Sequence, residues 1–75
     1  MRIKIKKHSG EIFVAFMDKI YNNAKIGCYS CYDDTHFETD INYINHSRNI
    51  KDEKTINKVL KALANRGYDN IEIIN

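Results

Sequence analysis

Proline is absent from this sequence, and glycine is scarce, with three residues among 75. These scarcities exclude the proline-rich and glycine-rich compositions of flexible linkers. Long apolar runs are missing as well, since no stretch approaches the roughly 18 to 20 consecutive apolar residues that a membrane-spanning helix needs. We therefore expect a single α+β domain over residues 1–75 and no membrane partner.

The start of the chain is basic, but the apolar run from Ile12 to Met17 is too short for the core of a secretory signal and ends without a small-residue cleavage site. We therefore expect a cytoplasmic protein. Isoleucine, asparagine, lysine and tyrosine supply 35 of the 75 residues, a bias that AT-rich coding sequence produces. This bias and the small size favour a phage or mobile-element protein, which would work in the host cytoplasm.

The chain does have enough apolar material for one core, because 43% of its residues are hydrophobic and 29% are charged. A domain this small removes only about 60% of its unfolded-chain surface from water, so we expect modest stability. Twelve basic and ten acidic residues leave a net charge of +2. This charge is too near balance to make nucleic-acid binding the default function.

The order of hydrophobic patterns predicts an α+β fold. The expected elements are a strand at 2–7, a helix at 10–23, strands at 25–32 and 36–44, a helix at 52–66 and a last strand around Ile71 and Ile73. This is split βαβ order, βαββαβ, with a four-stranded antiparallel sheet and two helices on one face, and it resembles the ferredoxin-like superfold. Because a superfold hosts many functions, the resemblance implies no particular activity.

The segment after Ser9 allows two interpretations. Its apolar residues fall on one half of a helical wheel, and Ser9 is a suitable N-cap. Alternatively, Ser9 and Gly10 form a two-residue hairpin turn that pairs Ile5 with Val14 and makes residues 11–18 a strand. The fold is then a ββββαβ meander with a single helix. We favour the helix, because a strand would carry apolar residues on both of its faces.

Turn and cap residues place the later elements. A two-residue turn at Asp33-Asp34 would set Ile26 opposite Ile41 in a hairpin. Asp52 is a candidate N-cap of the second helix, and Gly67 suits the left-handed position after its end. We expect this second helix to be the firmest element of the fold.

Two cysteines and two histidines, Cys28, Cys31, His36 and His46, are residue types that complete a zinc site. Side chains three positions apart on a regular strand point to opposite faces. We therefore expect Cys28 to be buried and Cys31 to face outward across from His36. The prediction is two reduced thiols, no metal and no cofactor.

Catalytic residues are sparse in this chain. An enzyme of the small ribonuclease or toxin type would depend on Asp33, Asp34 or His36. Cys31 and His36 could form a thiolate and imidazole pair for nucleophilic catalysis, but the sequence supplies no oxyanion hole or third orienting group for them. We therefore predict that the protein is not an enzyme, and a small ribonuclease or toxin stays as the last alternative.

The leading hypothesis is a small non-enzymatic interaction protein, such as a phage inhibitor or modulator that binds a host protein. The residues expected to meet this partner are Tyr29, Glu38 and Asp40 on the open sheet face and Lys54, Lys58 and Lys61 along the second helix. The alternative is a nucleic-acid-binding accessory protein that uses this lysine row together with Arg2 and Lys7. Pairing of edge strands between two copies would make a homodimer.

Overall fold

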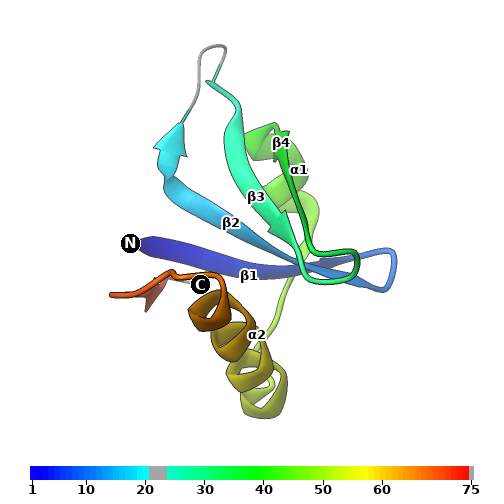
Figure 1. Cartoon of the computed structure of the whole chain (residues 1–75). Coiled ribbons are helices and arrows are strands. Elements are labelled where there is room, and N and C mark those ends of the chain that lie inside the picture. Colours follow the sequence, from blue (N-terminus) through cyan, green and yellow to red (C-terminus); the bar gives the residue numbers. More distant parts are fainter. Residues whose placement is uncertain (21–23, 75) are drawn as a thin grey trace.

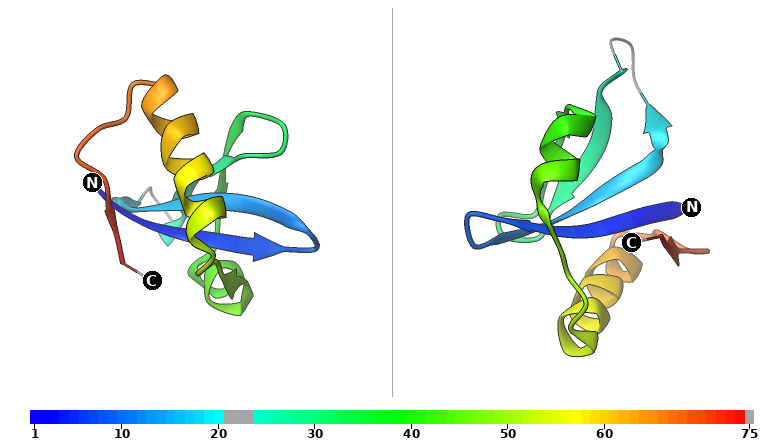
Figure 2. Two further views of the ribbon diagram at one scale, coloured as in Figure 1. Left: turned by 90° about the horizontal axis from the view of Figure 1, so that it is seen from below. Right: turned by 180° about the vertical axis from the view of Figure 1, so that it is seen from behind.

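The structure, a computed structural model, describes residues 1–20 and 24–74 and has α+β architecture (Figure 1). Its elements are β1 (Arg2–His8), β2 (Glu11–Ile20), β3 (Ile26–Ser30), β4 (Thr35–Thr39), α1 (Ile41–His46), β5 (Arg48–Asn49), α2 (Glu53–Asn65) and β6 (Glu72–Ile73). The strand order is β4-β3-β2-β1-β5, and β6 also pairs with β1. Figure 2 shows α1 and α2 on opposite faces of this sheet. The α+β class is therefore confirmed, with a largely antiparallel sheet and two helices.

The first two strands form a hairpin, so the predicted helix over 10–23 is wrong and the hairpin alternative is right. Ser9 and Gly10 have φ values of 51° and 81°, which are the two positive angles that a two-residue hairpin turn requires. The register sets Ile5 opposite Val14, as that alternative predicted. Residues 21–23 of the predicted helix lie outside the described part of the chain.

Apolar residues on both faces of β2 are explained by two cores. Val14 and Phe16 belong to the α2-side core, whose buried residues are Ile3, Ile5, Val14, Phe16, Tyr29, Val59 and Leu63. The α1-side core has the buried residues Phe13, Ala15, Ile26, Cys28 and Ile44. A strand that is covered on both sides carries a continuous apolar run instead of an alternating one. The argument for a helix assumed a single covered face, and α1 covers the second.

The hairpin of β3 and β4 has a longer turn than predicted. Residues 31–34 form the turn, and the register sets Ile26 opposite Thr39, so the pairing of Ile26 with Ile41 is wrong. The chain leaves the sheet after Thr39 and coils into α1, within the segment predicted as a strand over 36–44. α1 is only six residues long, and Ile44 is its buried residue.

The second helix matches its prediction closely. The Asp52 carboxylate caps its first turn by accepting from the Thr55 N–H. At its end, the Tyr68 N–H donates to the Leu63 carbonyl at 3.1 Å and the Gly67 N–H to the Ala64 carbonyl at 3.0 Å. This is the Schellman arrangement, with Gly67 at φ 90°.

The last strand pairs with β1 in parallel, with Glu72 beside Arg2. The split βαβ order and the single-helix meander are therefore both incorrect. The first four strands do form a meander, but α1 and β5 intervene before α2, and the helices cover opposite faces. The physical reason is the Ser9-Gly10 turn, which joins β1 directly to β2 where the split order needs a helical crossover. Within residues 1–20 and 24–74, no helix is long and apolar enough to span a membrane.

Candidate binding groove

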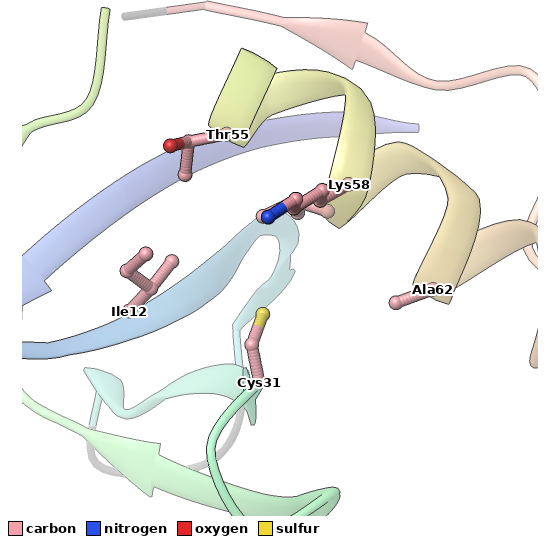
Figure 3. A pocket seen from close by; sticks show the side chains of 6 residues that line it. Ile12, Cys31, Thr55, Lys58 and Ala62 are labelled. Carbon is pink, nitrogen blue, oxygen red and sulfur yellow. The ribbon is translucent and has the colours of Figure 1, made fainter. Parts of the chain in front are cut away.

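A groove runs beside α2, where this helix lies over the ends of β2 and β3. One hollow, of about 320 Å³, is lined by Ile12, Cys31, Thr55, Lys58, Val59 and Ala62. A second, of about 180 Å³, is lined by Gly10, Glu11, Ile12, Cys31 and Tyr32. The two hollows share Ile12 and Cys31, so they adjoin at these residues, and together we call them the α2 groove. Figure 3 shows Ile12 and Cys31 on one side of the first hollow, with the α2 side chains on the other.

The floor of the α2 groove comes from the sheet. Ile12 faces α2 because β2 alternates its side chains and Val14, two residues further on, lies in the α2-side core. Cys31 directly follows β3, and its N–H donates to the Ile12 carbonyl at 3.1 Å, which holds these two residues side by side. Tyr32 comes next in the turn and is 77% exposed. The floor is therefore fixed by the backbone, while a large aromatic side chain stands free at one end.

α2 supplies the other wall. Thr55, Lys58 and Ala62 follow one another at spacings of three and four residues, so they share one side of the helix. The Asp52 carboxylate accepts from the Thr55 N–H at 2.9 Å and from its hydroxyl at 2.6 Å, which fixes the first turn of this wall. Since Ala62 and Cys31 are both small, helix and sheet leave the hollow open between them.

Basic side chains lie on the elements that form or adjoin the groove, and we call Lys7, Arg48, Lys54, Lys58 and Lys61 the cationic rim. Lys58 lines the groove itself, and Lys7 is paired with Ile12 across the ladder between β1 and β2. Among the described residues, no ion pair involves a rim residue. The ion pairs present join Arg2 to Asp18, Lys25 to Asp40 and Arg66 to Asp34. The groove thus combines an apolar floor with basic side chains that form no ion pair within the described part of the chain.

The predicted zinc residues are dispersed. Cys28 is 1% exposed in the α1-side core, as predicted. Cys31 lies on the opposite side of the sheet, but it is half-buried against the α2-side core, so the prediction that it faces outward is wrong. The residue across from His36 is Tyr29, which corrects the predicted pairing with Cys31. The His36 Nε2 is 2.8 Å from the Tyr68 hydroxyl, and the His46 Nδ1 is 2.7 Å from the Asn42 carbonyl. No group of three potential metal ligands converges within the described part of the chain.

Burial also changes the pKa of both thiols. It raises the pKa of Cys28 to about 12 and raises the pKa of Cys31 in the same direction. At neutral pH both are therefore protonated and weakly nucleophilic. Cys31 still lines both hollows, so its thiol is the cysteine that a groove ligand would meet.

The acidic residues of the β3–β4 turn do not converge with His36 on one site. Asp34 accepts from the Tyr29 hydroxyl and forms an ion pair with Arg66, whose Nε donates at 3.0 Å. Asp33 accepts from the Thr35 hydroxyl at 2.7 Å, and this hydrogen bond lowers the pKa of the Asp33 carboxyl. These contacts tie the turn together and, through Arg66, hold it to the end of α2.

The open sheet face predicted for partner binding does not exist. Tyr29 is 3% exposed in the α2-side core, because α2 covers the face that was expected to be open. Glu38 is exposed on the edge strand β4. Asp40 lies at the start of α1 and is paired with Lys25 at 2.6 Å. Of the predicted partner surface, only Glu38 and the lysines of α2 remain freely exposed.

Of the cations predicted to bind nucleic acid, four are exposed and one is already paired. Lys54, Lys58 and Lys61 are exposed along α2, and Lys7 is exposed at the end of β1. Arg2 is engaged, since its Nε donates to Asp18 at 2.8 Å. The lysine row is therefore available to a ligand, whereas Arg2 already has a partner.

Comparison with known proteins finds no match among protein-family models, curated proteins or solved structures. The sequence interpretation identified Lys58 but missed Ile12 and Ala62, which line the groove with it. The signal for Ile12 was the Ser9-Gly10 turn, because a strand after this turn places Ile12 on the same face as Val14. The hollow itself depends on contacts between segments more than forty residues apart, which no local pattern records.

Proposed function

We propose that this chain is a non-enzymatic interaction protein that binds a partner protein across the α2 groove. The observation that carries the proposal is the pair of adjoining hollows along Ile12 and Cys31, with the exposed Tyr32 lining one hollow and Lys58 lining the other. Concave, mostly apolar sites with a few polar groups are where ligands bind. Exposed tyrosines beside such sites are typical anchors of protein interfaces.

The groups that line the groove support binding rather than catalysis. Its one thiol, Cys31, has a raised pKa and is protonated at neutral pH. Among the described residues no histidine lines either hollow, so the Cys31 thiol has no imidazole partner in the groove. Glu11, Lys58 and Thr55 can position a ligand through hydrogen bonds and charge.

The interface must extend beyond the groove floor. A standard interface covers about 800 Å² on each partner, and the molecule exposes 5013 Å² in total. The partner would therefore cover roughly a sixth of the surface, which includes the exposed side of α2 and the turn that carries Tyr32. The small size of the chain and its residue bias, which is typical of AT-rich coding sequence, favour a phage or mobile-element modulator. Its partner would then be a host protein.

A pair of matched variants tests the proposal. Ala62→Trp fills the groove, whereas Ala64→Trp places the same side chain on an exposed position of the same helix. The native chain has no tryptophan, so the emission of each variant reports where its indole lies. We expect proteins from host lysate that are retained by the native chain and by Ala64→Trp to be lost with Ala62→Trp. Retention of the same proteins by all three chains, or of none at physiological salt, would contradict the proposal.

A nucleic-acid-binding function is the second candidate, and the cationic rim favours it. Lys7 and Arg48 lie directly opposite each other in the ladder of β1 and β5, an arrangement of like charges that destabilises a sheet. Bound phosphate would relieve this repulsion. The combined change of Lys54, Lys58 and Lys61 to Ala should then abolish binding to an oligonucleotide, and native affinity should fall steeply with salt. Unchanged binding in the triple variant would end this alternative.

A further inference from the structure

The charge around the α2 groove is one-sided. Lys58 stands on the wall, and Lys54 and Lys61 extend the same positive stripe along the exposed side of α2. At the Ile12 end, Lys7 and Arg48 add two exposed cations. Positive charge therefore lies on the helix side of the groove and at one end of its floor.

The acids near the groove do not cancel this charge. Glu11 lines the second hollow. Asp52 lies close enough to Lys58 for the lysine to help lower its pKa, after the larger effect of its hydrogen bonds from Thr55. The Asp52 Oδ2 accepts from the Thr55 hydroxyl at 2.6 Å and from the Thr55 N–H at 2.9 Å, so this carboxylate is already engaged in the helix cap. The charged residues that line the two hollows are Lys58 and Glu11, so the excess of positive charge comes from the neighbouring Lys7, Arg48, Lys54 and Lys61.

Part of this charge lowers folding stability. Lys7 and Arg48 are direct cross-strand partners, and like charges in such positions are unfavourable. The ion pairs of the described residues lie elsewhere and join Arg2 to Asp18, Lys25 to Asp40 and Arg66 to Asp34. An added carboxylate at the rim would meet the Lys7–Arg48 pair, for which the described residues show no ion pair.

The floor of the groove adds an apolar requirement. The first hollow, of about 320 Å³, is lined by aliphatic carbon of Ile12, Val59 and Ala62 as well as the Cys31 thiol. An apolar cavity of about 150 Å³ is enough to hold benzene. The hollow therefore has room for a leucine or phenylalanine side chain, which a phosphodiester backbone does not carry.

We infer that the α2 groove takes a short acidic segment of a partner protein, with one large apolar side chain in the hollow between Ile12 and Ala62 and carboxylates against Lys58 and the Lys7–Arg48 pair. This inference rests on the proposed function and names the chemistry of its partner. The apolar anchor supplies affinity by leaving water. The carboxylates supply orientation and fast association.

Selection from a random peptide library displayed on phage tests this chemistry with the full-length chain as bait. We expect the selected peptides to carry aspartate or glutamate on both sides of a leucine, phenylalanine or tryptophan. Synthesised and labelled, they should bind the native chain and Ala64→Trp with similar affinity and Ala62→Trp at least tenfold more weakly. Lys58→Glu should also lower the affinity for these peptides at least tenfold. Lys19→Glu makes the same change in net charge near the other end of β2 and should leave the affinity unchanged.

The outcomes separate the inference from the proposed function. Selected peptides that depend on Ala62 but are neutral or basic would overturn the acidic chemistry and leave groove binding in place. Peptides that bind Ala62→Trp as well as the native chain, or a selection that yields none, would overturn both. Binding of a single-stranded oligothymidylate that is lost in Lys58→Glu but kept in Ala62→Trp would assign the cationic rim to nucleic acid and overturn the inference.

Discussion

Replacing Ile44 with alanine tests the two-sided sheet directly. Ile44 is fully buried and is the residue through which α1 enters the α1-side core. The change removes three carbon atoms, worth about 0.8 kcal/mol each in transfer from water, and the cavity that remains adds to this loss. We therefore expect the free energy of unfolding to fall by about 2–5 kcal/mol. A 75-residue domain has roughly 4–11 kcal/mol in total, so the effect is a large fraction of its stability.

Ile41 in the same helix provides the control. It is 39% exposed, so Ile41→Ala should cost less than about 1 kcal/mol. Urea denaturation followed by circular dichroism measures both variants. The hairpin register predicted from sequence buried Ile41 opposite Ile26, so a larger loss for Ile41→Ala than for Ile44→Ala would refute the two-core arrangement.

Three further predictions concern the thiols, the helix end and the helix cap. In the folded chain, a disulfide reagent at pH 8 should modify Cys31 slowly and Cys28 only on unfolding. Burial raises the pKa of Cys31, and it raises the pKa of Cys28 to about 12. Cys31→Ser should abolish the reaction, and rapid labelling of two thiols would contradict the burial. Gly67→Ala should lower the free energy of unfolding by about 1–2 kcal/mol through backbone strain alone, since φ is 90° and a Cβ would meet no atom within 4 Å; an unchanged denaturation midpoint would be inconsistent with the Schellman end. The pKa of Asp52 is lowered by its hydrogen bonds from Thr55, so its stabilising effect is complete above the unfolded value of about 3.9 and is lost as pH falls through the folded pKa. Asp52→Asn should therefore show a shallower acid dependence of stability below about pH 4, and an identical acid profile would count against the cap.

The candidate site divides into residues that the sequence could indicate and residues that it could not. Lys54, Lys58 and Lys61 were predicted as an exposed row because helical spacing alone places them opposite the buried stripe of α2. Tyr29 was wrongly placed on an open surface, since its exposure depends on which sheet face α2 covers. Strand alternation tells which residues share a face, but it does not tell which face a distant helix will cover.

The sequence alone determined α2 and its ends. Asp52, the apolar stripe and Gly67 act within a few residues of one another, so local hydrogen bonds and backbone preference were sufficient to predict the helix. The Ser9-Gly10 turn could also be predicted from neighbouring residues, and it belongs to the alternative that proved correct.

Only the tertiary structure decided that residues 11–20 form a strand. A segment with apolar residues at nearly every position satisfies both helical and strand periods, and burial on two faces is what makes the strand favourable. The six-residue α1 that covers the second face is too short to be stable by itself, because helix nucleation is costly and packing must supply the stabilisation. The α2 groove depends on the same long-range packing, since Ile12, Cys31 and Ala62 meet only when sheet and helix are assembled.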